Sequence, residues 1–121
     1  MKKTVIFLLF LGVIFNVFVN SVQAQANTKT LLYLYSSDCG YCIKFNPIYK
    51  KISEAFAGKC NFKKVDARTA EGQRLMQKYN GVFVPYVLII DDEKNYKAYL
   101  TPNCILSYAC TSSAVENFVK K

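Results

Sequence analysis

Two cysteines three positions apart follow directly on a short apolar segment, and this arrangement limits the possible folds more than any other feature. Residues 31–35, LLYLY, have the length and composition of a buried β-strand. The next residues are SSDCGYC, so Cys39 and Cys42 stand about one turn apart if a helix begins there. Ser37 or Asp38 can cap that helix, because a side-chain oxygen accepts a hydrogen bond from its unpaired backbone N–H groups. The pattern predicts an α/β fold with both thiols at a strand-to-helix junction.

The apolar pattern beyond this junction predicts the element order β-α-β-α-β-β-α. Later strands are expected over 62–65, 86–90 and 96–100, a second helix over 69–79, and a short last helix from the capping box Ser113–Glu116. Because helices separate the first three strands, we expect these strands to be parallel and the hairpin to add an antiparallel edge. The expected fold is a mixed central sheet flanked by helices. The buried face of the first helix is expected to hold Cys42, Phe45, Tyr49, Ile52 and Phe56.

The first 24 residues have the composition of an export signal. Lys2 and Lys3 precede an almost unbroken apolar run over 5–19, and small residues around Ala24 suit a signal peptidase. The run is shorter than the about 20 residues that a membrane span needs. We therefore expect a signal peptide over 1–24 and one domain over 25–121, in the periplasm or another extracytoplasmic space. An uncleaved membrane anchor is the alternative.

Lysine makes the chain basic without forming a binding tract. The formal net charge is +8, and loss of Lys2 and Lys3 with the signal lowers it to +6. The lysines are scattered along the chain and are not interleaved with arginines and aromatic residues. Such a distribution indicates a solvated surface rather than a nucleic-acid interface. We expect that the protein has no nucleic-acid partner and that it is a monomer.

The expected position of Cys39 at a helix N-terminus predicts a reactive thiol. Unpaired N–H groups and the helix dipole stabilise a thiolate there, and the thiolate is the form that attacks a disulfide. Cys42 lies one turn further on, where it can attack the resulting mixed disulfide. We therefore expect Cys39 to be the catalytic nucleophile, Cys42 the resolving cysteine, and the pair a redox-active disulfide. Such chemistry needs no metal and no organic cofactor.

Other uses of paired cysteines stay open beside redox chemistry. The five cysteines could supply four thiolates to a metal, but the chain has no histidine and no second close cysteine pair. The Cys39–Cys42 bond could also be purely structural. A domain that binds an extended peptide without turnover is the main alternative function, and a metal carrier is a further one.

Three features in the right order resemble the thioredoxin superfamily over residues 30–120. They are the CGYC motif at the junction, Pro47 five residues after it, and Val84-Pro85 before a buried strand. The resemblance implies a minimal thioredoxin fold that exchanges disulfides with protein substrates carrying thiols or disulfides. It also implies that Pro85 is cis. The residues that it places against an extended substrate are Val84, Pro85, Gly40 and Tyr41.

Details of the motif are similar to one branch of this superfamily. The Gly-Tyr pair between the cysteines resembles exported Dsb-type isomerases, which implies a reductase or isomerase with a membrane electron donor or acceptor. Tyr33 stands where thioredoxins carry a buried acid. Asp38 is expected to disfavour a thiolate on Cys39 if its carboxylate lies close. Together with the absence of histidine, these residues argue against a strong oxidant.

The remaining cysteines are expected in two different places. The first helix carries Cys60 about 27 Å from the junction, where we expect a buried structural thiol. The second strand of the hairpin should return to the Cys39 end, so the loop over 101–110 is expected there. Cys104 and Cys110 enclose five residues of that loop, and we predict a disulfide between them. We interpret it as a structural staple, with a second exchangeable pair as the alternative.

Overall fold

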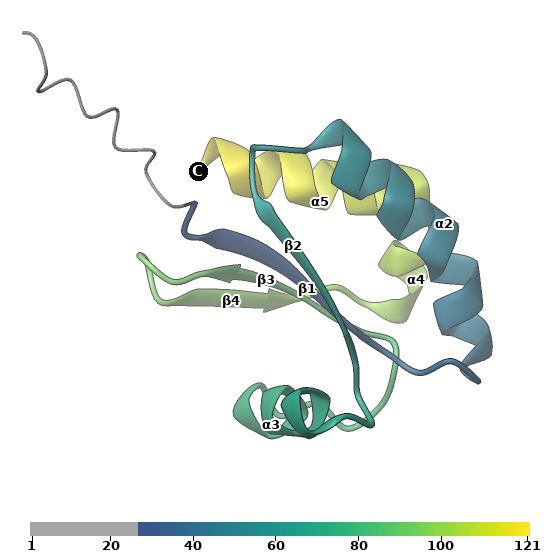
Figure 1. Ribbon diagram of the computed structural model, residues 1–121. Coiled ribbons are helices and arrows are strands. Elements are labelled where there is room, and N and C mark those ends of the chain that lie inside the picture. Colours follow the sequence, from purple (N-terminus) through teal and green to yellow (C-terminus); the bar gives the residue numbers. More distant parts are fainter. Residues whose placement is uncertain (1–26) are drawn as a thin grey trace, which may run out of the picture.

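The central strand β1 (Lys29–Tyr35) lies in a four-stranded mixed sheet with the order β2-β1-β3-β4. The computed structural model describes residues 27–121 (Figure 1), so the expected signal peptide over 1–24 lies outside the described residues. None of the helices within 27–121 is long and apolar enough to cross a membrane. The other elements are α2 (Gly40–Ala55), β2 (Asn61–Asp66), α3 (Ala70–Lys78), β3 (Tyr86–Asp91), β4 (Tyr96–Tyr99), α4 (Pro102–Ile105) and α5 (Tyr108–Lys120).

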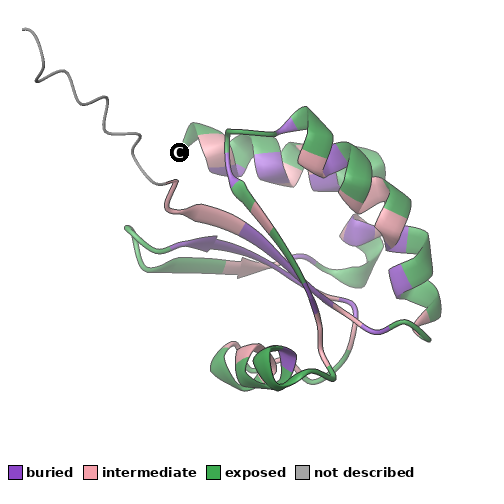
Figure 2. Ribbon diagram, in the orientation of Figure 1, coloured by how far each residue is buried: buried purple, intermediate pink, exposed green. Residues whose placement is uncertain are grey.

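The apolar segment of β1 is buried on both faces of the sheet, as its composition predicts. Helices α2 and α5 cover one face and α3 covers the other (Figure 1). Successive side chains of a strand point to opposite faces. Leu31 and Tyr33 therefore pack with α2 and α5, whereas Leu32 and Leu34 pack with α3. Figure 2 shows the buried residues gathered along β1 and β3 and on α2 and α5.

The buried face of α2 follows the predicted helical spacing. Cys42, Phe45 and Ile52 are fully buried, and Tyr49 and Phe56 pack against the same cluster. The inward-facing residues of α3 are those expected from its sequence, namely Leu75 and Met76, followed by Tyr79 at the helix C-cap.

The prediction of three parallel strands is wrong for β3. Strands β1 and β2 are parallel, with Tyr35 opposite Asp66, but β3 runs antiparallel to β1 with Tyr86 opposite Leu34. The reason lies in the connection after β2, because the chain passes through the nine residues of α3 and returns to the end of the sheet that it left. Strand direction then reverses. As a result, the chain before Tyr86 lies at the same end of the sheet as the Cys39 junction.

The C-terminal segment contains one more helix than predicted. Thr101 caps the short helix α4, and Ser107 caps α5, which begins at Tyr108 rather than near Ser113. The side-chain oxygen of each cap accepts a backbone N–H at 3.3 Å, from Cys104 and Cys110 respectively. The capping-box pattern at Ser113 lies inside a helix that has already started, so its signal is not used.

Cys60 is a buried free thiol at the end of α2 opposite Cys39, as expected. Burial raises the pKa of its thiol to about 11. Burial, followed by the proximity of Cys60, also raises the pKa of Tyr49 to about 12. Both groups therefore stay protonated in the folded protein at pH values where the unfolded chain begins to ionise them.

Replacing Cys60 by alanine is expected to weaken the dependence of stability on alkaline pH. A raised folded-state pKa contributes stability that is complete below the unfolded value of 9.0 and is lost as pH rises toward about 11. The thiol can account for a slope of up to about 1.4 kcal/mol per pH unit. Urea denaturation at pH 7, 9, 10 and 11 measures the free energy of unfolding, with pH 7 giving the packing loss alone. Equal alkaline slopes in both proteins would contradict this role of Cys60.

Candidate functional site

Cys39 is itself the N-cap residue of α2. Its backbone is extended, with φ −88° and ψ 114°, and its Sγ accepts the backbone N–H of Cys42 at 3.1 Å. The prediction that Ser37 or Asp38 caps the helix is wrong, because the sulfur takes the place of the capping oxygen. The Sγ atom lies at the positive end of the helix dipole, where a thiolate is stabilised.

Cys39 and Cys42 form a disulfide, with their Cα atoms 5.1 Å apart. The two residues differ in exposure. Cys42 is 1% exposed and belongs to the core cluster, whereas Cys39 is partly exposed at its edge. A partner molecule can therefore reach Cys39 more readily than Cys42, and only the protein interior surrounds the second sulfur.

The residues that the resemblance assigned to substrate lie on two segments. Gly40 and Tyr41 form the exposed first turn of α2, and Tyr41 is 58% exposed. Val84 packs against the cluster that contains Cys42, and the Val84–Pro85 peptide bond is cis. Their contacts with a substrate stay a prediction.

Two exposed apolar residues beside this segment were missed in the sequence. Val82 is 84% exposed and Phe83 is 47% exposed, immediately before Val84. The ring of Phe83 packs edge-on against Tyr86 and Tyr99. Apolar residues next to a buried strand give no sign of exposure in the sequence, and the structure shows that both residues face solvent.

Tyr33 supports the first turn of α2 from below. Its ring is fully buried, and its hydroxyl lies 3.2 Å from the carbonyl oxygen of Cys42 and 3.0 Å from Oδ1 of Asn46. Burial raises the pKa of Tyr33 well above its ordinary value. The position at which the resemblance places an acid therefore holds a neutral hydroxyl, which anchors the helix and cannot act as a base near neutral pH.

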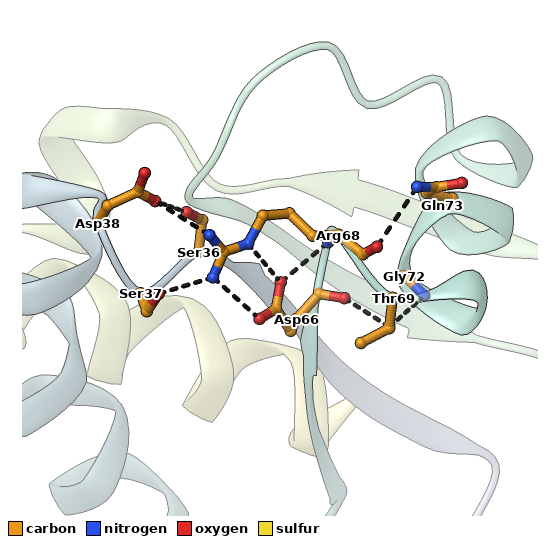
Figure 3. Close-up of polar contacts among 8 residues, drawn as sticks. All are labelled: Ser36, Ser37, Asp38, Asp66, Arg68, Thr69, Gly72 and Gln73. Atoms are coloured by element: carbon orange, nitrogen blue, oxygen red, sulfur yellow. Dashed lines mark hydrogen bonds and ion pairs between the residues drawn. The ribbon is translucent and has the colours of Figure 1, made fainter.

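Arg68 connects the end of β2 with the segment before Cys39 and was not identified from the sequence (Figure 3). Its Nη2 donates to Oγ of Ser37 at 2.6 Å and lies 3.3 Å from Oδ2 of Asp66. Its Nη1 is 3.8 Å from Oδ1 of Asp38. The sequence held one indication of this contact. Asp66 ends a strand that the βαβ pattern places beside β1, so the residues after Asp66 are expected near the residues after Tyr35.

The carboxylate of Asp38 has partners of its own. It accepts a hydrogen bond from the hydroxyl of Ser36 and forms an ion pair with Arg68. The Ser36 hydroxyl contributes most to lowering the pKa of Asp38, and Arg68 lowers it further. The charge of Asp38, the residue before Cys39, is therefore paired with a cation.

A second disulfide joins Cys104 at the end of α4 to Cys110 in the first turn of α5. The hydroxyl of Thr111 donates to the carbonyl oxygen of Cys104 at 2.9 Å, and Thr111 is fully buried. Ile105 belongs to the same core cluster as Cys42. Within residues 27–121, no group of three or more His, Cys, Asp or Glu side chains is placed to hold a metal ion.

Comparisons with known proteins agree with this fold. A family model described as "Thioredoxin" matches residues 13–105. No significant match is found among curated proteins. The chain is similar to the J-Trx1 fragment of ERdj5 with a TM-score of 0.67 and 13% identity, covering 78% of this chain and 45% of that one. It therefore spans less than half of that fragment.

Two similar structures are single thioredoxins. The germline-specific thioredoxin Deadhead of Drosophila melanogaster gives a TM-score of 0.62 with 16% identity, covering 75% of this chain and 81% of that chain. Oxidised mitochondrial thioredoxin 3 of Saccharomyces cerevisiae gives 0.61 with 16% identity, covering 75% and 79%. At these identities the likeness shows the fold.

Replacing Tyr33 by phenylalanine is expected to lower the free energy of unfolding by about 1 kcal/mol, because the buried hydroxyl bond to the first turn of α2 is lost. Urea denaturation of the oxidised protein measures this change. Tyr35→Phe, at the half-buried end of the same strand, is the matched control and should cost less. Equal losses in the two variants would show that the Tyr33 hydroxyl does not anchor α2.

Proposed function

Because the chain belongs to the thioredoxin family, we propose that it is an exported thiol–disulfide oxidoreductase acting on protein substrates. The proposal rests on the difference in exposure between its two paired cysteines. Cys39 is partly exposed at the N-cap of α2, and Cys42 is buried beneath it. Cys39 is the nucleophile and Cys42 the resolving residue.

The reaction in the reducing direction has two exchange steps. The thiolate of Cys39 attacks one sulfur of a substrate disulfide, forms a mixed disulfide and releases the other substrate sulfur as a thiolate. The thiolate of Cys42 then attacks Sγ of Cys39 and releases the second substrate sulfur. Two electrons pass to the substrate, and the Cys39–Cys42 disulfide forms. An external dithiol, supplied in an extracytoplasmic space by a membrane protein, reduces it again.

An extended substrate would lie between the first turn of α2 and the segment before β3. Gly40 and Tyr41 form one side, and Val84 and Pro85 form the other. The exposed side chains of Val82 and Phe83 extend the second side with an apolar surface. Such a surface suits an unfolded or extended chain, and a reductase or isomerase acts on such substrates.

The two cysteines are expected to behave differently when each is replaced. Cys42→Ser should form a mixed disulfide with a substrate and keep it, because no neighbouring thiol is left to attack Sγ of Cys39. Cys39→Ser should lose essentially all exchange activity and trap nothing. A disulfide-linked fluorescent peptide reports turnover, and non-reducing electrophoresis with mass spectrometry reports trapping. Retained turnover in Cys39→Ser would refute the assignment.

Replacing both Cys104 and Cys110 by serine is expected to lower stability without changing turnover. Loss of a disulfide that closes so short a loop costs about 2 kcal/mol in the chain-entropy treatment. Urea denaturation measures the loss, and the peptide assay measures turnover below the denaturation midpoint. A tenfold drop in turnover of the folded variant would instead make this pair an exchangeable relay.

A further inference from the structure

The segment that precedes Cys39 is held by a side chain from another part of the chain. We propose that Arg68 is a positioning residue for Cys39: its guanidinium group fixes Ser37 and offsets the charge of Asp38, and so sets the reactivity of the exposed sulfur. The inference rests on the proposed role of Cys39 as the nucleophile. Figure 3 shows Arg68 between Asp66 and the segment Ser36–Asp38.

Arg68 is itself fixed before it reaches this segment. Its backbone N–H donates to Oδ1 of Asp66 at 2.9 Å, and its carbonyl oxygen accepts a hydrogen bond from Nε2 of Gln73 at 3.3 Å. Nε of its side chain is also 3.3 Å from Oδ1 of Asp66. The guanidinium group therefore has a defined direction, and its Nη atoms point at Ser37 and Asp38.

The start of α3 packs closely enough to keep Arg68 in place. A Cβ atom at Gly72 would overlap the backbone of Asp66 and Ala67, so only glycine allows this approach. Thr69, the N-cap of α3, donates its hydroxyl to the carbonyl oxygen of Asp66 at 2.7 Å and accepts the N–H of Gly72 at 3.1 Å. The residues on both sides of Arg68 are thus tied to the end of β2.

Arg68 forms ion pairs with both carboxylates of this region, Asp38 and Asp66. Asp38 and Asp66 are both held ionised, since hydrogen bonds from Ser36 to Asp38 and from Arg68 to Asp66 lower the pKa of each carboxyl. On β2, Nζ of Lys64 lies over the ring of Tyr35, 4.7 Å from its centroid. On α2, Nζ of Lys44 lies over the ring of Tyr41, 5.6 Å from its centroid. Arg68 is therefore the cation paired with the carboxylate that precedes Cys39.

The contacts suit arginine rather than lysine. One planar guanidinium group reaches Ser37, Asp38 and Asp66 together, whereas an ammonium group is a single point charge on a flexible stem. Arg68, Ser37 and Asp38 are exposed and Asp66 is partly exposed. Ion pairs that are open to solvent contribute little to stability. The effect of Arg68 should therefore appear in the reactivity of Cys39 more than in the melting temperature.

The test measures labelling of Cys39 by iodoacetamide in the reduced protein from pH 5 to 10, with peptide mass spectrometry to separate the five cysteines. In Arg68→Gln, the half-point of the labelling curve should rise by about half a pH unit or more, because no cation then offsets the charge of Asp38, the residue before Cys39. Arg68→Lys should give a smaller rise. Asp38→Asn should lower the half-point, and Asp38→Asn combined with Arg68→Gln should return it toward wild type.

Arg74→Gln is the matched control, because it removes the other arginine of the chain from an exposed position on α3. Its curve should overlay that of the wild type. An Arg68→Gln curve that overlays the control, or an Asp38→Asn curve that does not move, overturns the inference. Asp38→Asn keeps the test valid if Arg68→Gln folds poorly.

A glutathione equilibrium supplies a second readout. A less stable thiolate makes the reduced form less favourable, so Arg68→Gln should hold a larger fraction of the Cys39–Cys42 disulfide at the same glutathione ratio. An unchanged fraction overturns the inference. Neither readout requires substrate turnover. Shifted labelling curves without turnover would overturn the proposed function alone, whereas turnover with unshifted curves would overturn only the role of Arg68.

Discussion

The burial of β1 on both faces determines where the chemistry of this protein can take place. A strand enclosed by helices on each side can meet solvent only where it ends, and β1 ends at Tyr35. The chain leaves the sheet there, turns through Ser36–Asp38 and starts α2 at Cys39. The same core that hides Cys42 leaves Cys39 at its edge. One sulfur is thus presented to partners and the other kept away from them by packing alone.

The reversed direction of β3 provides the other half of the site. A parallel strand would have begun at the far end of the sheet and carried Val84 and Pro85 away from Cys39. The short return through α3 instead starts β3 beside the end of β1. The hairpin then brings the chain back, where the N–H of Leu100 donates to the carbonyl oxygen of Val87 at 2.9 Å. The ends of β1 and β2, the start of β3 and the end of β4 thereby meet at one end of the sheet.

Sequence patterns predicted the features that depend on neighbouring residues in the chain. The buried faces of α2 and α3 and the element order up to β4 followed from periodicity, and the CGYC motif placed Cys39 at a helix start. The direction of β3 could not be predicted, because it depends on how far α3 travels before the chain returns. The cap of α2 was missed since a sulfur rather than an oxygen accepts the N–H of Cys42. Arg68 was missed because two of its partners, Ser37 and Asp38, lie on a loop about thirty residues earlier.

The burial of Cys60 has a consequence for how the chain must mature. In an oxidising compartment an odd cysteine is a hazard, since any of the other four can pair with it. Once the core forms, Cys60 is enclosed and protonated, and the remaining cysteines are left to their neighbours in the chain. In the proposed extracytoplasmic setting, collapse of the core around Cys60 before oxidation leaves the other four cysteines to form the two pairs of the folded protein.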